Sequence, residues 1–202
     1  MEAKQIPGVP QQKKGSFHDT ESQKYFENSS AAIQQFEIVK KRFFNISQWQ
    51  QYCGNNLANF KLYDSYGYFI ERDPQIGDFV KIDIPGPGDA EAKGYDWVKI
   101  INISSEKGDN YERILISCSP SVVPGEQKDR HVAHFYSSEA TSNFMILRKD
   151  NCITTAVYGR NERPNFDTTF INIIRNIFIA IGGMMGASKI QWKCLTDGLL
   201  DF

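Results

Sequence analysis

The sequence predicts an α+β fold in which an antiparallel β-sheet of about six or seven strands packs against helices at the C-terminus. Two observations lead to this prediction. Between about residues 59 and 159, short runs of apolar residues alternate with polar ones and are separated by turn-forming residues. From about residue 168 the apolar spacing changes to the helical period. The short connections favour a meander, which is typical of antiparallel sheets.

The expected strands follow one another closely along the chain. Residues 59–72 form a hairpin pattern, with Asp64 to Gly67 as its turn. Three further apolar segments, 77–84, 96–105 and 112–119, have strand character. Residues 142–159 predict another hairpin, with Lys149, Asp150 and Asn151 at its tip. The stretch between 119 and 140 has no regular pattern and is expected to be a long loop.

Two segments precede the first hairpin: one fits a helix or a strand, and the other is expected to be a short helix. In residues 33–44 a helix would place Ile33, Phe36, Val39, Lys40 and Phe43 near one face, whereas a strand would also fit the alternation. Residues 45–53 predict a short helix, because Asn45 or Ser47 can cap it and Trp49 and Tyr52 give it an apolar face.

Residues 1–30 are rich in Gln, Lys, Ser and Glu and poor in aliphatic residues. Such a segment buries too little apolar area to offset the entropy of ordering it. We therefore expect a polar N-terminal arm that is disordered unless bound, followed by a single α+β domain over 31–202. We expect the arm to bind to the surface of a protein partner.

The most apolar stretch, residues 170–192, is expected to pack on the sheet. A membrane span needs roughly 20 apolar residues, but Arg175 and Lys189 bracket a shorter run that also contains glycines. The apolar residues instead recur at the spacing of one helix face, which predicts an amphipathic helix. They are Phe170, Ile173, Ile174, Ile177, Phe178 and Ile181. A second helix over 188–200 is expected to place Ile190, Cys194, Trp192 and Leu195 against the core.

Composition excludes several classes of protein. The formal net charge is −1, so no long-range attraction to nucleic acid or an anionic membrane is expected. The N-terminus has no secretory signal, and the four cysteines are far apart, which predicts a cytoplasmic protein with reduced, buried thiols. No phosphate-binding loop, nucleophile elbow or zinc motif is present, so we expect no cofactor, no metal and no enzymatic activity.

The order of elements resembles the START-like, helix-grip proteins. From "FEIVKKRFFNISQWQQYC" to "SKIQWKCLTDGLLDF" the chain offers an early strand, a short Trp-bearing helix, a run of antiparallel strands and a long terminal helix. The resemblance implies a curved sheet wrapped around the C-terminal helix, with a cavity for an apolar ligand between them. A small β-barrel with flanking helices is the alternative architecture.

Two groups of residues are candidates for a polar site. His131 and His134 lie three residues apart in the long loop, where a solvated loop is expected rather than a metal site. Arg160, Glu162 and Arg163 connect the last strand to the terminal helix. They could grip an anionic group or form a local ion pair in a charged connector.

The function expected first is that of a non-enzymatic, soluble interaction module, such as a subunit of a larger assembly. The aromatic residues of the first hairpin, Tyr63, Tyr66, Tyr68 and Phe69, suit a recognition surface. The alternative is a START-like carrier of an apolar small molecule or lipid. Its cavity candidates are Ile174, Phe178, Ile181, Met184 and Met185. An enzyme using His131, His134 or the Arg160 loop has the least support.

Overall fold

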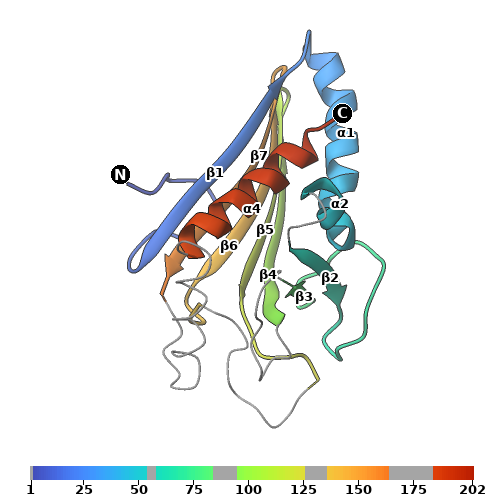
Figure 1. Cartoon of the computed structure of the whole chain (residues 1–202). Helices are drawn as coiled ribbons and strands as arrows, with labels where there is room; N and C mark the ends of the chain where they lie inside the picture. The colour runs from blue at the N-terminus through green and yellow to red at the C-terminus, as the bar shows by residue number, and fades with distance from the viewer. Residues whose placement is uncertain (1, 54–57, 84–94, 126–135, 164–183) are drawn as a thin grey trace.

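The computed structural model of the chain describes residues 2–53, 58–83, 95–125, 136–163 and 184–202. They form one curved antiparallel sheet of seven strands in the order β1-β7-β6-β5-β4-β3-β2 (Figure 1). β1 and β2 are the two edges of the sheet and do not pair with each other, so the sheet is open. The predicted α+β fold with a helix-grip arrangement is confirmed, and the alternative of a β-barrel is wrong.

Most elements coincide with expected segments, but one strand comes earlier than any expected, and the second strand of the hairpin expected over 59–72 is reduced to an isolated bridge between Tyr63 and Phe69. In chain order they are β1 (Ser16–Tyr25), α1 (Ser29–Phe44), the 3-10 helix η1 (Ile46–Gln48), α2 (Trp49–Cys53), β2 (Asn59–Tyr63), β3 (Phe79–Asp83), β4 (Tyr95–Lys107), β5 (Tyr111–Pro120), β6 (Thr141–Lys149), β7 (Cys152–Glu162) and α4 (Met184–Leu199). The one segment left open between helix and strand, residues 33–44, is helical, and the predicted tip at Asp150 and Asn151 joins β6 to β7.

The helices cover one face of the sheet, which we call the inner face. Helix α1 starts at the N-cap Asn28, whose side-chain oxygen accepts the Ala31 N–H at 2.9 Å. Its buried face is formed by Ala32, Phe36, Val39 and Phe43, whereas Ile33, expected on this face, is 46% exposed. This face packs on β6 and β7, which join the main hydrophobic core with α2 and α4.

Helix α4 lies across β1 and β7 on the inner face (Figure 1). Its core face carries Leu195, Thr196 and Leu199, which are buried. Ile190 is 62% exposed, so the expectation that it packs on the core is wrong. Ile190 precedes Leu195 by five positions. At 3.6 residues per turn this places the two side chains about 140° apart around the helix axis, so Ile190 lies on the other side of the helix. None of the described helices is both long and apolar enough to cross a membrane.

Strand β1 comes from the segment expected to be a disordered arm. Its main chain pairs with β7 along nearly its whole length, from Ser16 opposite Glu162 to Tyr25 opposite Cys152. Its inward side chains His18, Thr20 and Ser22 are buried yet polar. Ser22, for example, donates to Asp197 Oδ1 at 2.7 Å and lies 2.8 Å from Thr196 Oγ1 on α4. Hydrogen bonds to the sheet and to α4 thus stabilise a strand that has little apolar surface.

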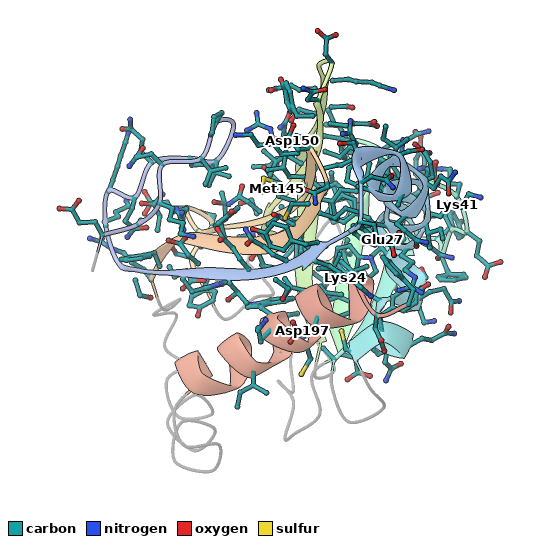
Figure 2. The ribbon with its side chains drawn as sticks, turned by 90° about the horizontal axis from the view of Figure 1, so that it is seen from above. Lys24, Glu27, Lys41, Met145, Asp150 and Asp197 are labelled. Carbon is teal, nitrogen blue, oxygen red and sulfur yellow. The ribbon has the colours of Figure 1, made fainter. Side chains whose placement is uncertain are left out.

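Residues 2–15, which we call the arm, lie on the opposite, outer face of the sheet. Figure 2 shows the N-terminal segment and α4 on opposite sides of β1. The residues Ile6 to Val9 form a turn closed by the Val9 N–H to Ile6 carbonyl bond of 3.0 Å, with Gly8 at φ 81°. Pro7 followed by a glycine with positive φ is the signature of a type II turn. The turn places Ile6 and Val9 together against an outer-face cluster of Leu115, Met145, Ala156 and Tyr158.

Candidate functional site at the inner face

The candidate site begins with an aromatic layer on the inner face, made of Trp49, Phe60, Phe144 and Trp192. The ring centroids of Trp49 and Phe144 are 4.9 Å apart, and those of Phe144 and Trp192 are 5.6 Å apart. Trp49 is buried, whereas Trp192 on α4 is only half-buried. The layer therefore ends in a large aromatic side chain, Trp192, part of whose surface is exposed.

A polar group lies directly beside the open side of this layer. The His18 ring stacks on Trp192, with centroids 6.4 Å apart and planes 12° from parallel. His18 Nε2 is 3.4 Å from Glu162 Oε1, and both side chains are 5% exposed. Because charged and imidazole side chains are seldom buried this deeply, the pair is an unusual chemical feature beside the apolar layer.

Tyr136 joins this group from a different part of the chain. The Ser137 N–H donates to the Arg163 carbonyl at 2.9 Å, so this segment runs beside the end of β7. Burial raises the pKa of the Tyr136 phenol, and the nearby carboxylates of Glu162 and Asp96 raise it further. The phenol therefore stays protonated at neutral pH. We call His18, Tyr136 and Glu162 the polar cluster.

Glu162 reaches the inner face because β7 contains a bulge. Opposite Ser16 and His18 on β1 lie Glu162 and Gly159 on β7, so Phe17 alone faces both Arg160 and Asn161. Regular alternation would place Glu162 on the same face as Arg160, which is the outer one. The extra residue of the bulge turns Glu162 back to the inner face.

Gly159 makes room for the two buried side chains. A Cβ atom at this position would point to the inner face and collide with the Glu162 carboxylate and the His18 ring. Any other residue would therefore displace the pair. The absence of a side chain at Gly159 and the bulge that follows it together build the polar cluster.

The residues expected in the polar site separate into two faces. The Arg160 side chain is 1% exposed and lies on the outer face, where it pairs with Asp19 at 2.7 Å and donates to the Lys4 carbonyl at 2.9 Å. Arg163 is exposed. Of these three residues only Glu162 lies in the polar cluster, and Arg160 lies on the opposite face of the sheet.

The remaining expected site residues cannot be placed. His131, His134, Ile174, Phe178 and Ile181 lie outside the described residues, as do the side chains of Met184 and Met185. Among the residues that the structure describes, no group of three His, Cys, Asp or Glu side chains is positioned to hold a metal ion.

Sequence reasoning did not include His18, Tyr136 or Trp192 in a site. His18 was counted in the polar segment 1–30, which was expected to be disordered, because β1 alternates buried polar residues with more exposed polar ones, a pattern that hydropathy cannot distinguish from disorder. One local signal was available: the Ile-Pro-Gly-Val sequence at 6–9 is a strong type II turn pattern with an apolar residue at each end. It indicates that the arm folds back on an apolar surface.

Comparisons with known proteins give likenesses of fold at low sequence identity. No family model matches the chain, and no curated protein matches it. A hypothetical protein, jhp0584, from Helicobacter pylori has a TM-score of 0.47 at 11% identity, over 95% of this chain and 90% of that one. Norcoclaurine synthase from Thalictrum flavum has a TM-score of 0.39 at 6% identity, over 92% and 94%. Major latex-like protein 151 from Panax ginseng has a TM-score of 0.33 at 10% identity, over 82% and 95%. TM-scores below 0.5 at such identities carry no conclusion about what this chain binds or does.

Proposed function

We propose that the chain binds a small molecule that has an apolar, ring-bearing body and a hydrogen-bonding head. The body would lie against the half-buried face of Trp192, and the head would contact the polar cluster. The single observation that carries the proposal is the buried His18–Glu162 pair stacked beside Trp192 at the edge of an apolar layer. Ligand sites are typically apolar surfaces with a few convergent polar groups.

The polar cluster suits a neutral or weakly charged head better than a strong anion. The Tyr136 phenol stays protonated and can donate a hydrogen bond, whereas the Glu162 carboxylate accepts one. A hydroxyl, amide or amine group can pair with both kinds of partner. An anionic head would meet the carboxylates of Glu162 and Asp96, which already act on Tyr136.

Binding can be tested first on the purified full-length chain. Native mass spectrometry would reveal a molecule that co-purifies, and titration with the fluorescent probe 1-anilinonaphthalene would measure affinity for an aromatic amine. We expect Trp192→Ala and Glu162→Gln each to weaken probe binding about tenfold, which corresponds to roughly 1.4 kcal/mol. The exposed hairpin variant Tyr68→Ser is the control and should leave the affinity unchanged. Equal affinity in all four proteins would rule out this site.

A second candidate function is recognition of another protein through the first hairpin. Tyr66, Tyr68 and Ile76 are 77%, 72% and 62% exposed, and Phe69 is 45% exposed. Large apolar side chains gathered on one exposed loop are typical of interaction surfaces. The arm supports this function less well, because its apolar residues Ile6 and Val9 already pack on the chain's own sheet. Light scattering of the wild type and of a Tyr66→Ser/Tyr68→Ser variant tests for self-association, and a monomer in both cases would remove the support for assembly with itself.

A further inference from the structure

We infer that the arm is a positioning element of the inner-face site, acting from the opposite side of the sheet. It holds the β7 bulge in place through Asn161 and thereby keeps Glu162 against His18. The inference rests on the proposed function for its consequence in binding, but its structural part does not depend on any ligand.

The key residue is Asn161, which has φ 55°. This left-handed conformation is sparsely populated by residues other than glycine, although asparagine tolerates it better than most. A regular β conformation is the preferred state of a strand residue, and it would return Glu162 to the outer face. Something in the fold must therefore hold Asn161 in the bulge.

The arm supplies four hydrogen bonds to Asn161. The Asn161 N–H donates to Gln12 Oε1 at 2.8 Å, and its side-chain Nδ2 donates to the Gln11 carbonyl at 3.2 Å. Its side-chain oxygen accepts the N–H groups of Lys13 at 2.8 Å and Lys14 at 3.2 Å. We call these contacts the clamp. Three of the four involve the side chain of Asn161, and the fourth satisfies its backbone N–H.

The arm is itself held at both ends of the clamp. Before it, the Lys4 N–H donates to Asp19 Oδ2 at 2.9 Å, and Lys4 Nζ pairs with Glu21 at 2.6 Å. Within the clamp, Lys14 pairs with Glu139, and Gln12 Nε2 donates to the carbonyls of Lys14 and Gly15 at 2.8 and 3.0 Å. After it, the chain enters β1, where Ser16 lies opposite Glu162. The clamp is thus a built structure and not a chance contact of a loose terminus.

The Gln12→Ala/Asn161→Gly variant tests the clamp directly. It removes all four clamp bonds, and glycine still allows the positive φ. The readout in the ligand-free protein is the nuclear Overhauser contact between the His18 ring and the Gly159 α-protons, together with hydrogen exchange at the amides of Asn161 and Glu162. We expect the contact to weaken at least twofold and the exchange of these amides to accelerate at least tenfold.

Two further variants distinguish an effect of the clamp bonds from a general loss of stability. Asn161→Asp keeps the oxygen that accepts the Lys13 and Lys14 N–H groups, and it should behave nearly as the wild type. Ile6→Ser/Val9→Ser detaches the apolar part of the arm and spares the clamp, so it should lower stability while keeping the His18–Gly159 contact. An unchanged contact in Gln12→Ala/Asn161→Gly, or an equal loss in Ile6→Ser/Val9→Ser, would overturn the inference.

The same variants distinguish this inference from the proposed function. With 1-anilinonaphthalene as the probe, Gln12→Ala/Asn161→Gly should bind about tenfold more weakly, and Ile6→Ser/Val9→Ser should bind as the wild type does. If the wild type does not bind the probe but the His18–Gly159 contact still depends on the clamp, positioning by the arm stands and the binding proposal fails. If binding is lost while the contact is unchanged, positioning by the arm is wrong.

Discussion

Gly159 shows how one missing side chain shapes the inner face. Its Cβ position is taken by the carboxylate of Glu162 and the ring of His18, so this position could not carry a side chain without moving a buried, polar pair. Glycine is otherwise unfavourable within a strand. The role of Gly159 is therefore to leave space for the two side chains.

Gly159→Ala should destabilise the fold by about 1–3 kcal/mol, the range for overpacking in a well-packed interior. Urea denaturation of the wild type and the variant measures the difference. In a Glu162→Ala background part of the clash disappears, so the same substitution should cost clearly less. Equal costs in the two backgrounds would show that Glu162 does not occupy this space.

Two buried thiols make stability depend on pH in the alkaline range. Burial raises the pKa of Cys53 and of Cys118 from 9.0 to about 12. Above pH 9 the thiols ionise in the unfolded chain but stay protonated in the folded protein. The unfolded state is then favoured, and stability falls as pH rises from 9 towards 12.

We expect each thiol to contribute a decrease of about 1.4 kcal/mol per pH unit above 9. The measurement is the free energy of unfolding at several values between pH 8 and about 9.5, which stays below the ordinary pKa of tyrosine, about 10. A Cys53→Ala/Cys118→Val variant will be less stable overall, but its stability should decline less steeply over this range. An identical slope in variant and wild type would contradict the prediction.

At the scale of elements, the end of α4 is stabilised by a residue from another helix. Arg42 Nη1 on α1 lies 3.3 Å from the Gly198 carbonyl, 3.2 Å from that of Leu199 and 2.7 Å from that of Asp201. The last carbonyls of a helix have no partner within the helix. A guanidinium group at this end also interacts favourably with the helix dipole.

Arg42→Met should therefore destabilise the protein by about 1.5–3 kcal/mol, as for hydrogen bonds to a charged group, and should increase hydrogen exchange in the last turn of α4. Lys41→Met changes a neighbouring, exposed cation of α1 and is the matched control. It should leave both measurements within error of the wild type. Similar effects of the two substitutions would mean that charge on α1, and not the bonds to α4, is responsible.

The element order was largely predictable, because strands and helices have different apolar periods. β2 to β7 and the helices α2 and α4 coincide with expected segments, since their buried residues alternate or recur at the helical spacing. Helix α1 coincides with a segment that the pattern left open between helix and strand. β1 was not predictable in this way. Its buried residues are His18, Thr20 and Ser22, and the partners of His18 and Ser22 lie on β7 and α4, distant in the chain.

At the scale of the whole molecule, the sheet is covered on both faces. Helices α1, α2 and α4 cover the inner face, and the arm covers the outer-face cluster around Leu115 and Met145 (Figures 1 and 2). The arm therefore completes the outer apolar cluster and is part of the folded domain. Without it, the sheet would expose a contiguous apolar patch.

A variant lacking residues 2–14 should lose about 2–4 kcal/mol of stability, since Ile6 and Val9 are each half-buried against this cluster. Urea denaturation measures the loss, and light scattering should reveal self-association through the exposed cluster. A synthetic peptide of residues 2–15 in excess should restore part of the stability by mass action. An unchanged unfolding midpoint in the shortened chain would show that the arm does not stabilise the fold.

The sequence by itself determined the fold class, the positions of β2 to β7 and the helical nature of the C-terminus. These features depend on the apolar period and the turn residues, which can be read within each segment without knowledge of its neighbours in space. Only the tertiary structure decided that β1 belongs to the sheet, that the arm lies on the outer face and that Arg160 and Glu162 lie on opposite faces. The physical reason is that polar side chains are buried where distant residues satisfy them, and one bulge at Asn161 turns Glu162 to the face opposite that of Arg160.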